Sequence, residues 1–117
     1  MDIESLRTFC LSLPHAEEDL KWGNDLCFTI VKKIFCSTGL EGEFGVSLKV
    51  RDEEFEELSE TDGIIPAPYA ARNKWILVRD PNRWNQKEWE HYITQSYEMI
   101  KSKLPKRVLN ELDKQPN

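Results

Sequence analysis

The sequence contains few of the signals that assign a protein to a membrane or an export route. No apolar run approaches the ~20 residues that a membrane-spanning helix needs. The first five residues, Met1 to Ser5, lack the basic and apolar regions of a signal peptide. We therefore expect a cytoplasmic protein that does not enter a membrane.

Cysteine is scarce and shows no metal-binding pattern. Cys10, Cys27 and Cys36 form an odd, widely spaced set, and the chain has no C-x-x-C motif. Free cysteines behave as small buried hydrophobes in a reducing compartment. We therefore predict no metal site, and expect all three thiols to be buried.

Motifs that carry common enzyme chemistry are also absent. The chain has no G-x-x-x-x-G-K-S/T, G-x-G-x-x-G, H-E-x-x-H or G-x-S-x-G motif. Its only histidines, His15 and His91, lie in no nucleophile motif, and we expect both to be exposed. We predict no catalytic residue and no cofactor, and expect that the protein is not an enzyme.

What is present is the composition of one folded domain. The 117 residues are 39% hydrophobic and include twelve aromatics, which suits a single domain over residues 1–117. The net charge of −5 argues against a nucleic-acid protein, but residues 72–107 hold nine basic and four acidic groups. Such an asymmetry marks either an anionic partner or an ordinary solvated face.

Two helices have clear boundaries in the sequence. Asp2 is placed to cap a helix that Pro14 ends, and Asn85 with Glu88 forms the spacing of a capping box. Apolar residues from Trp89 to Leu104 then recur at helical spacing. The sequence therefore predicts a short first helix and a long helix near the C-terminus.

Strands are predicted between these helices. Residues 26–31 and 34–38 indicate a hairpin with Lys32 and Lys33 at its tip. The other expected elements are a loop over 14–25, a strand over 46–51, a short helix from 52, an extended or irregular segment over 64–69, a strand over 74–79 and a final short helix from 108. The order α-β-β-β-α-β-α-α predicts a two-layer α+β domain with an antiparallel sheet.

Four aromatic residues lie next to polar or basic residues: Trp22, Tyr69, Trp75 and Trp84. Such rings either stack on bases and ligands or belong to the core with basic stems packed over them. Trp84 follows a polar loop, so we expect it to be the most exposed of the four.

Several short sequence motifs, taken together, resemble those of the MmcQ/YjbR family of small bacterial proteins. They occur in the family's order over roughly residues 6–107. The motifs are Leu13-Pro14-His15-Ala16-Glu17-Glu18, Trp22-Gly23, Lys33-Ile34-Phe35, Ser47-Leu48-Lys49, Pro66-Ala67-Pro68-Tyr69, Lys74-Trp75 and the segment from Ser96-Tyr97 to Leu104-Pro105-Lys106.

The resemblance implies a fold like that of the CyaY and secretion-chaperone group. It also implies DNA binding through a "double wing" of β-hairpins, with Leu26–Thr38 as the first wing. Lys33 and Lys49 match lysines of the family motifs, whereas Val31 and Lys32 occupy positions where members of that family often have glycines. Fold alone does not establish function.

Three functional hypotheses follow. The first is DNA binding, in which basic residues on one strand-rich face contact phosphates: Lys32, Lys33, Lys49, Arg51, Arg72, Lys74 and Arg79. The second is a protein-interaction or secretion-chaperone-like module, either a monomer or a homodimer. The third is a pocket for a small anionic ligand, lined by Trp22, Tyr69 and Trp75 with Lys33 as the anion anchor.

Overall fold

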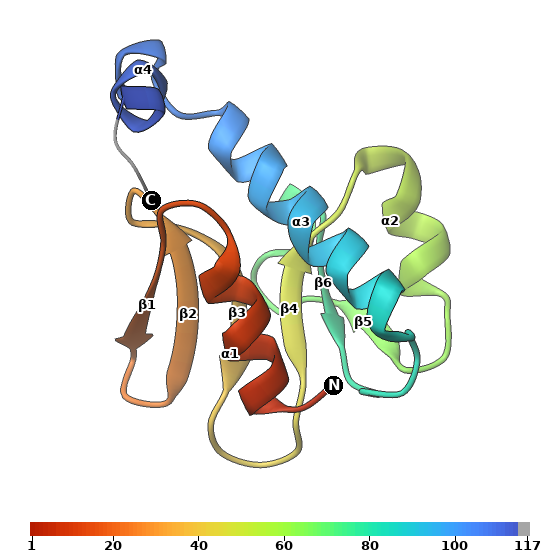
Figure 1. Ribbon diagram of the computed structural model, residues 1–117. Coiled ribbons are helices and arrows are strands. Elements are labelled where there is room, and N and C mark those ends of the chain that lie inside the picture. Colours follow the sequence, from red (N-terminus) through yellow and green to blue (C-terminus); the bar gives the residue numbers. More distant parts are fainter. Residues whose placement is uncertain (115–117) are drawn as a thin grey trace.

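A six-stranded antiparallel sheet forms one layer of the molecule and helices form the other (Figure 1). The computed structural model describes residues 1–114. The strand order across the sheet is β1-β2-β3-β4-β6-β5. The strands are β1 (Ala16–Lys21), β2 (Asp25–Ile30), β3 (Lys33–Gly39), β4 (Val46–Lys49), β5 (Ile64–Pro66) and β6 (Trp75–Val78).

The helices gather on one side of this sheet. In Figure 1, α1 and α3 cross the same face, α2 lies beside β5 and β6, and α4 projects at one end. The helices are α1 (Ile3–Ser12), α2 (Asp52–Ser59), the short 3₁₀ helix η1 (Ala71–Asn73), α3 (Gln86–Ser102) and α4 (Lys106–Lys114). The predicted two-layer α+β class is confirmed.

The core lies between α3 and the sheet. Trp89, Ile93 and Tyr97 of α3 are at most 1% exposed and belong to one cluster with Phe28 and Leu48 of the sheet. The Tyr97 hydroxyl donates to the carbonyl of Pro14 at 2.6 Å. The apolar face of α3 therefore covers one side of the strands.

Ser96 of α3 joins two strands where their ladder ends. The pairing of β3 with β4 stops at Cys36 and Leu48. Beyond that point, the Ser96 hydroxyl donates to the Phe35 carbonyl at 2.6 Å and accepts from the Lys49 N–H at 3.0 Å. One side chain thus satisfies two buried backbone groups that would otherwise lack partners.

Both predicted helix starts are confirmed. The Asp2 carboxylate accepts from the Ser5 N–H at 2.8 Å. Asn85 and Glu88 form the reciprocal capping box, with hydrogen bonds of 2.8 and 3.0 Å. These local contacts are set by sequence neighbours, which is why the sequence alone predicts them.

The hairpin tip lies one residue earlier than predicted. Val31 and Lys32 form the turn, with φ values of 47° and 65°, and Lys33 begins β3. Two consecutive left-handed residues give the turn twist that suits a two-residue hairpin. The backbone therefore adopts the preferred hairpin geometry without the glycines that usually permit it.

Two strands were missed by the sequence prediction. The segment predicted as a loop over 14–25 contains β1, and the segment over 64–69 contains β5. β1 is an edge strand whose middle four residues are exposed, so it has no apolar alternation. β5 has only three residues and ends at Pro66, which an edge strand tolerates.

Burial corrects two further expectations. Trp84 is only 7% exposed, because it stacks on Tyr92 with ring centroids 4.2 Å apart and meets Trp89 edge-on at 5.0 Å. His15 is half-buried, whereas His91 is exposed as expected. The three cysteines are buried, as predicted. No helix within residues 1–114 is both long enough and apolar enough to span a membrane.

Candidate binding groove on the open sheet face

The face of the sheet opposite α1 and α3 carries a row with a cysteine and two serines at its centre and two aliphatic residues at one end. The register places Cys27, Ser37, Ser47, Leu77 and Ile65 side by side across five strands. Their neighbours along each strand point into the helix-covered core, because side chains alternate between the two faces. This second face is therefore not the one that α1 and α3 cover.

Two adjoining hollows lie on the open face. Their volumes are about 500 and 510 Å³. Both are lined by Asp25, Ser37, Ser47, Pro68 and Tyr69, so they form one continuous depression, called the sheet-face groove below. Trp22 and Trp75 line the first hollow, and Glu43 and Arg79 line the second.

Two aromatic rings of the groove stand in solvent on unusual backbone. Trp22 is 76% exposed with φ 54°, and Tyr69 is fully exposed with φ 66°. A non-glycine residue in this left-handed region costs roughly 1 kcal/mol or more. Neither ring belongs to the core cluster. Core packing therefore does not account for the placement of these two side chains.

Short hydrogen-bonded turns hold these rings in place. Trp22 and Gly23 lie in the turn between β1 and β2, where Lys21 pairs with Asp25. The segment with Tyr69 is closed by the Ala67 N–H, which donates to the Trp75 carbonyl at 3.0 Å. The backbone that carries each ring is thus held next to a strand end.

Lys49 fastens the end of the Tyr69 segment to the sheet. Its ammonium donates to the carbonyl of Asn73, and the Val50 N–H donates to the Lys74 carbonyl at 2.9 Å. Lys49 is only 9% exposed, and this burial, aided by the nearby charge of Lys103, lowers the pKa of its ammonium. Lys49, predicted as a phosphate contact, therefore lies nearly buried, with its ammonium bonded to the backbone of its own chain.

The polar groups of the groove centre on Asp25. Its carboxylate makes no hydrogen bond or ion pair with any residue in 1–114. Ser37 and Ser47 pair directly across β3 and β4. Burial, followed by the charge of Asp25, raises the pKa of the neighbouring Cys27 thiol. The groove therefore offers an acceptor carboxylate and two hydroxyls.

The predicted basic face is not assembled. Lys32 and Lys33 lie at the hairpin end of the sheet, whereas Arg79 follows β6 at the opposite end. All three are exposed and make no ion pair within residues 1–114. Lys33 does not line the groove, so it is not placed to anchor an anion there.

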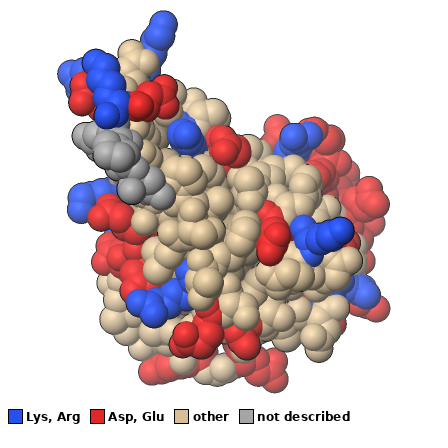
Figure 2. Space-filling view, in the orientation of Figure 1, with Lys and Arg blue, Asp and Glu red and all other residues tan. Residues whose placement is uncertain are grey.

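The other predicted basic residues lie near the helices. Arg51 precedes α2 and Arg72 lies in η1, and both are exposed. The Lys74 ammonium lies over the Phe55 ring, 5.1 Å from its centroid. Figure 2 shows basic and acidic side chains interspersed on the helix-covered face, with carboxylates gathered near α2. No uniformly basic surface appears in that view.

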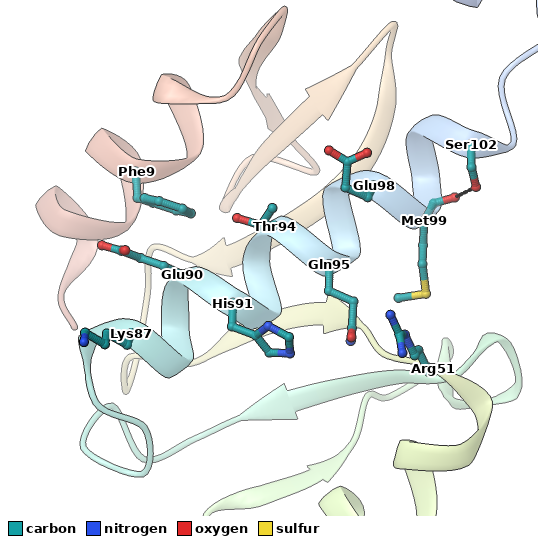
Figure 3. Close-up of a pocket in the computed structure, with 10 residues that line it drawn as sticks. All are labelled: Phe9, Arg51, Lys87, Glu90, His91, Thr94, Gln95, Glu98, Met99 and Ser102. Carbon is teal, nitrogen blue, oxygen red and sulfur yellow. Dashed lines mark hydrogen bonds between the residues drawn. The ribbon is translucent and has the colours of Figure 1, made fainter.

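A third hollow, of about 610 Å³, lies on the outer side of α3 (Figure 3). Thr94 and Glu98 project to one side of the helix there. His91 and Gln95 project to the other side, where the Gln95 amide donates to Glu54 at 2.8 Å. These four side chains therefore diverge around the helix and do not converge on one point of the hollow.

Sequence reasoning selected Trp22, Tyr69 and Trp75, and the structure brings these three together. It missed Asp25, Ser37 and Ser47. Ser47 alternates with buried Val46 and Leu48, and this alternation was a usable signal for an outward-facing polar residue. No comparable signal marked Asp25, because its place depends on the pairing of β2 with two other strands.

Comparison with solved structures shows related folds. Protein DR2400 from Deinococcus radiodurans, which carries the domain DUF419, matches with a TM-score of 0.84 and 24% identity, over 95% of this chain and 87% of its own. A Pseudomonas syringae protein, structural genomics target PsR293, matches with a TM-score of 0.72 and 20% identity, over 86% of this chain and 99% of its own. At these identities the matches establish the fold.

The family itself is established by a sequence model. No curated protein matches the chain. The YjbR family model matches residues 11–99, which hold β1 to β6, α2 and nearly all of α3. This span includes every residue named in the sheet-face groove. The family is also the one that the short sequence motifs resemble. The chain belongs to the YjbR family.

Proposed function

We propose that the protein is a non-enzymatic DNA-binding module that takes unpaired bases into the sheet-face groove. One observation carries the proposal: Trp22, Tyr69 and Trp75 line the same hollow of about 500 Å³. Stacking of a base on an aromatic side chain contributes about 1–3 kcal/mol. Two exposed rings with strained backbones are well suited to this use.

Unpaired bases fit the groove better than a duplex does. An aromatic ring can stack only on a base whose face is free, and duplex bases already stack on one another. Phosphate contacts would be few, because the unpaired cations Lys32, Lys33 and Arg79 lie at opposite ends of the sheet. The carboxylates of Asp25 and Glu43 would keep phosphates away from the groove itself.

Salt dependence distinguishes this proposal from duplex binding along a basic face. With two or three phosphates neutralised, log K for a single strand is expected to fall with log salt at a slope of about −1.4 to −2.1. Five phosphates on a duplex would give a slope of about −4 to −5. The measurement is fluorescence anisotropy of one labelled strand, free and as its duplex, at several salt concentrations.

Two variants separate the contributions to this slope. The change Lys32→Glu with Lys33→Glu is expected to weaken single-strand binding and to make its slope shallower. Lys106→Glu with Arg107→Glu, at the exposed start of α4 and far along the chain from the groove segments, is the control with the same change of charge and is expected to leave the slope unchanged. Tighter binding of the duplex than of the strand, with a steep slope, would contradict the proposal.

The open edge of β1 is the feature that a protein partner would use. Its acidic side chains are those that natural edge strands use to prevent pairing. Glu18 is also engaged by the Arg7 guanidinium at 2.6 and 2.7 Å. The charged edge of β1 therefore supports binding of a protein partner less strongly than the three aromatic residues of the groove support binding of a base.

A further inference from the structure

The Asp25 carboxylate is the acidic group that shares a hollow with Trp22 and Trp75. It lines both hollows and is half-buried at the start of β2. Within residues 1–114 no hydrogen bond or ion pair satisfies it. A partly desolvated carboxylate forms strong charge-assisted hydrogen bonds with a ligand that supplies N–H groups. Asp25 therefore favours a ring with donors on its edge.

We propose that Asp25 makes the groove selective for guanine among the four DNA bases. The proposal rests on the proposed function, because it names which base that groove prefers. Guanine presents two adjacent N–H donors, the ring N1–H and the 2-amino group, which match the two oxygens of one carboxylate. Adenine, cytosine and thymine each present donors at a single position of the corresponding edge.

The groups around Asp25 complement the rest of the guanine edge. Ser37 lies on β3, which pairs with the strand of Asp25, Ser47 lies on β4 beyond it, and both line the same hollow as Asp25. A serine hydroxyl can donate to the guanine O6, which is an acceptor. Trp22, Tyr69 and Trp75 supply the faces on which the ring stacks. Hydrogen bonds and stacking thus act on different parts of one base.

Glu43 provides a matched control within the same groove. It is also acidic, but it is exposed and lines only the second hollow, away from Trp22 and Trp75. Replacing either carboxylate by its amide removes one negative charge and keeps the shape. A general electrostatic effect would therefore appear in both variants, whereas base selection would change only with Asp25→Asn.

The test uses five nine-residue strands of thymidine that differ only at the centre, which is dT, dA, dC, dG or deoxyinosine. For the unaltered protein, the dG strand is expected to bind about tenfold more tightly than the dT strand. Deoxyinosine lacks the 2-amino group and is expected to fall between them. Asp25→Asn is expected to reduce the dG preference to about twofold or less, and Glu43→Gln to retain it.

The outcomes separate this inference from the proposed function. Equal binding of all five strands, or a dG preference that survives Asp25→Asn, would overturn the role of Asp25 while leaving base stacking intact. Binding of none of the strands would overturn both. Circular dichroism checks that Asp25→Asn is folded, and a spectrum like that of the unaltered protein is expected because the carboxylate has no hydrogen-bond or ion-pair partner in residues 1–114.

Discussion

Replacing Trp22 and Tyr69 together by alanine is expected to weaken single-strand binding by about 30-fold or more. Both rings line the sheet-face groove, and each loses a stacking contact worth about 1–3 kcal/mol. The free energy of unfolding should change little, because neither ring belongs to the core. Anisotropy titration and urea unfolding measure the two quantities on the same samples.

Leu40→Ala is the control for this double variant. Leu40 is an exposed apolar side chain, 45% accessible, in the loop between β3 and β4, and it does not line either hollow. It is expected to bind strands as tightly as the unaltered protein. If the double variant matched Leu40→Ala in affinity, base stacking in the groove would be refuted.

Trp84→Ala is expected to lower the free energy of unfolding by about 3–5 kcal/mol. The Trp84 ring is nearly buried and contacts Tyr92 and Trp89 at 4.2 and 5.0 Å between centroids. Its removal leaves a cavity beside the start of α3, because the surrounding rings cannot close it completely. Urea unfolding followed by circular dichroism measures the loss.

Trp22→Ala is the matched comparison, since it removes the same side chain from an exposed position. Its free energy of unfolding is expected to stay within about 0.5 kcal/mol of the unaltered protein. Comparison of Trp84→Ala with Trp22→Ala thus distinguishes an effect on folding stability from an effect on binding. Similar destabilisation by both substitutions would show that the Trp22 ring has a structural role and is not held free for a ligand.

The predictable parts of the fold are those that depend on neighbours in sequence. The long helix was predicted correctly because its apolar residues recur at helical spacing and because Asn85 and Glu88 bond to each other's backbone. β1 was missed because an exposed edge strand needs no apolar alternation. Trp84 was misjudged because its burial depends on Tyr92, which only the folded helix brings against it.

In the candidate site too, only the features that depend on neighbours in sequence could be predicted. Trp22, Tyr69 and Trp75 could be selected from the sequence as aromatics beside polar residues, but their meeting in one hollow depends on the turn after β1 and the segment before β6. Lys49 was predicted to contact phosphate because it matches a lysine of the family motif and lies on a predicted strand. The chain after Pro66 covers it and accepts its hydrogen bond through Asn73.

The sheet-face groove also changes what DNA binding would mean for this member of the family. A double wing would present hairpin tips to a duplex, and the tip at Val31 and Lys32 offers little beyond Lys32 and Lys33. The groove lies on the sheet itself and holds three aromatic rings, a carboxylate and two serines. Its chemistry suits the faces and edges of single bases.

The most direct test of base stacking is a ¹⁵N–¹H spectrum of the four tryptophan indole groups, recorded while a mixed-sequence single strand is added. Trp22 and Trp75 line the groove, whereas Trp84 and Trp89 are buried with the helices. The Trp22 and Trp75 signals are predicted to shift with the bound fraction, and those of Trp84 and Trp89 to stay in place. Shifts confined to the amides of Lys32 and Lys33, with all four indole signals unmoved, would contradict base binding in the sheet-face groove.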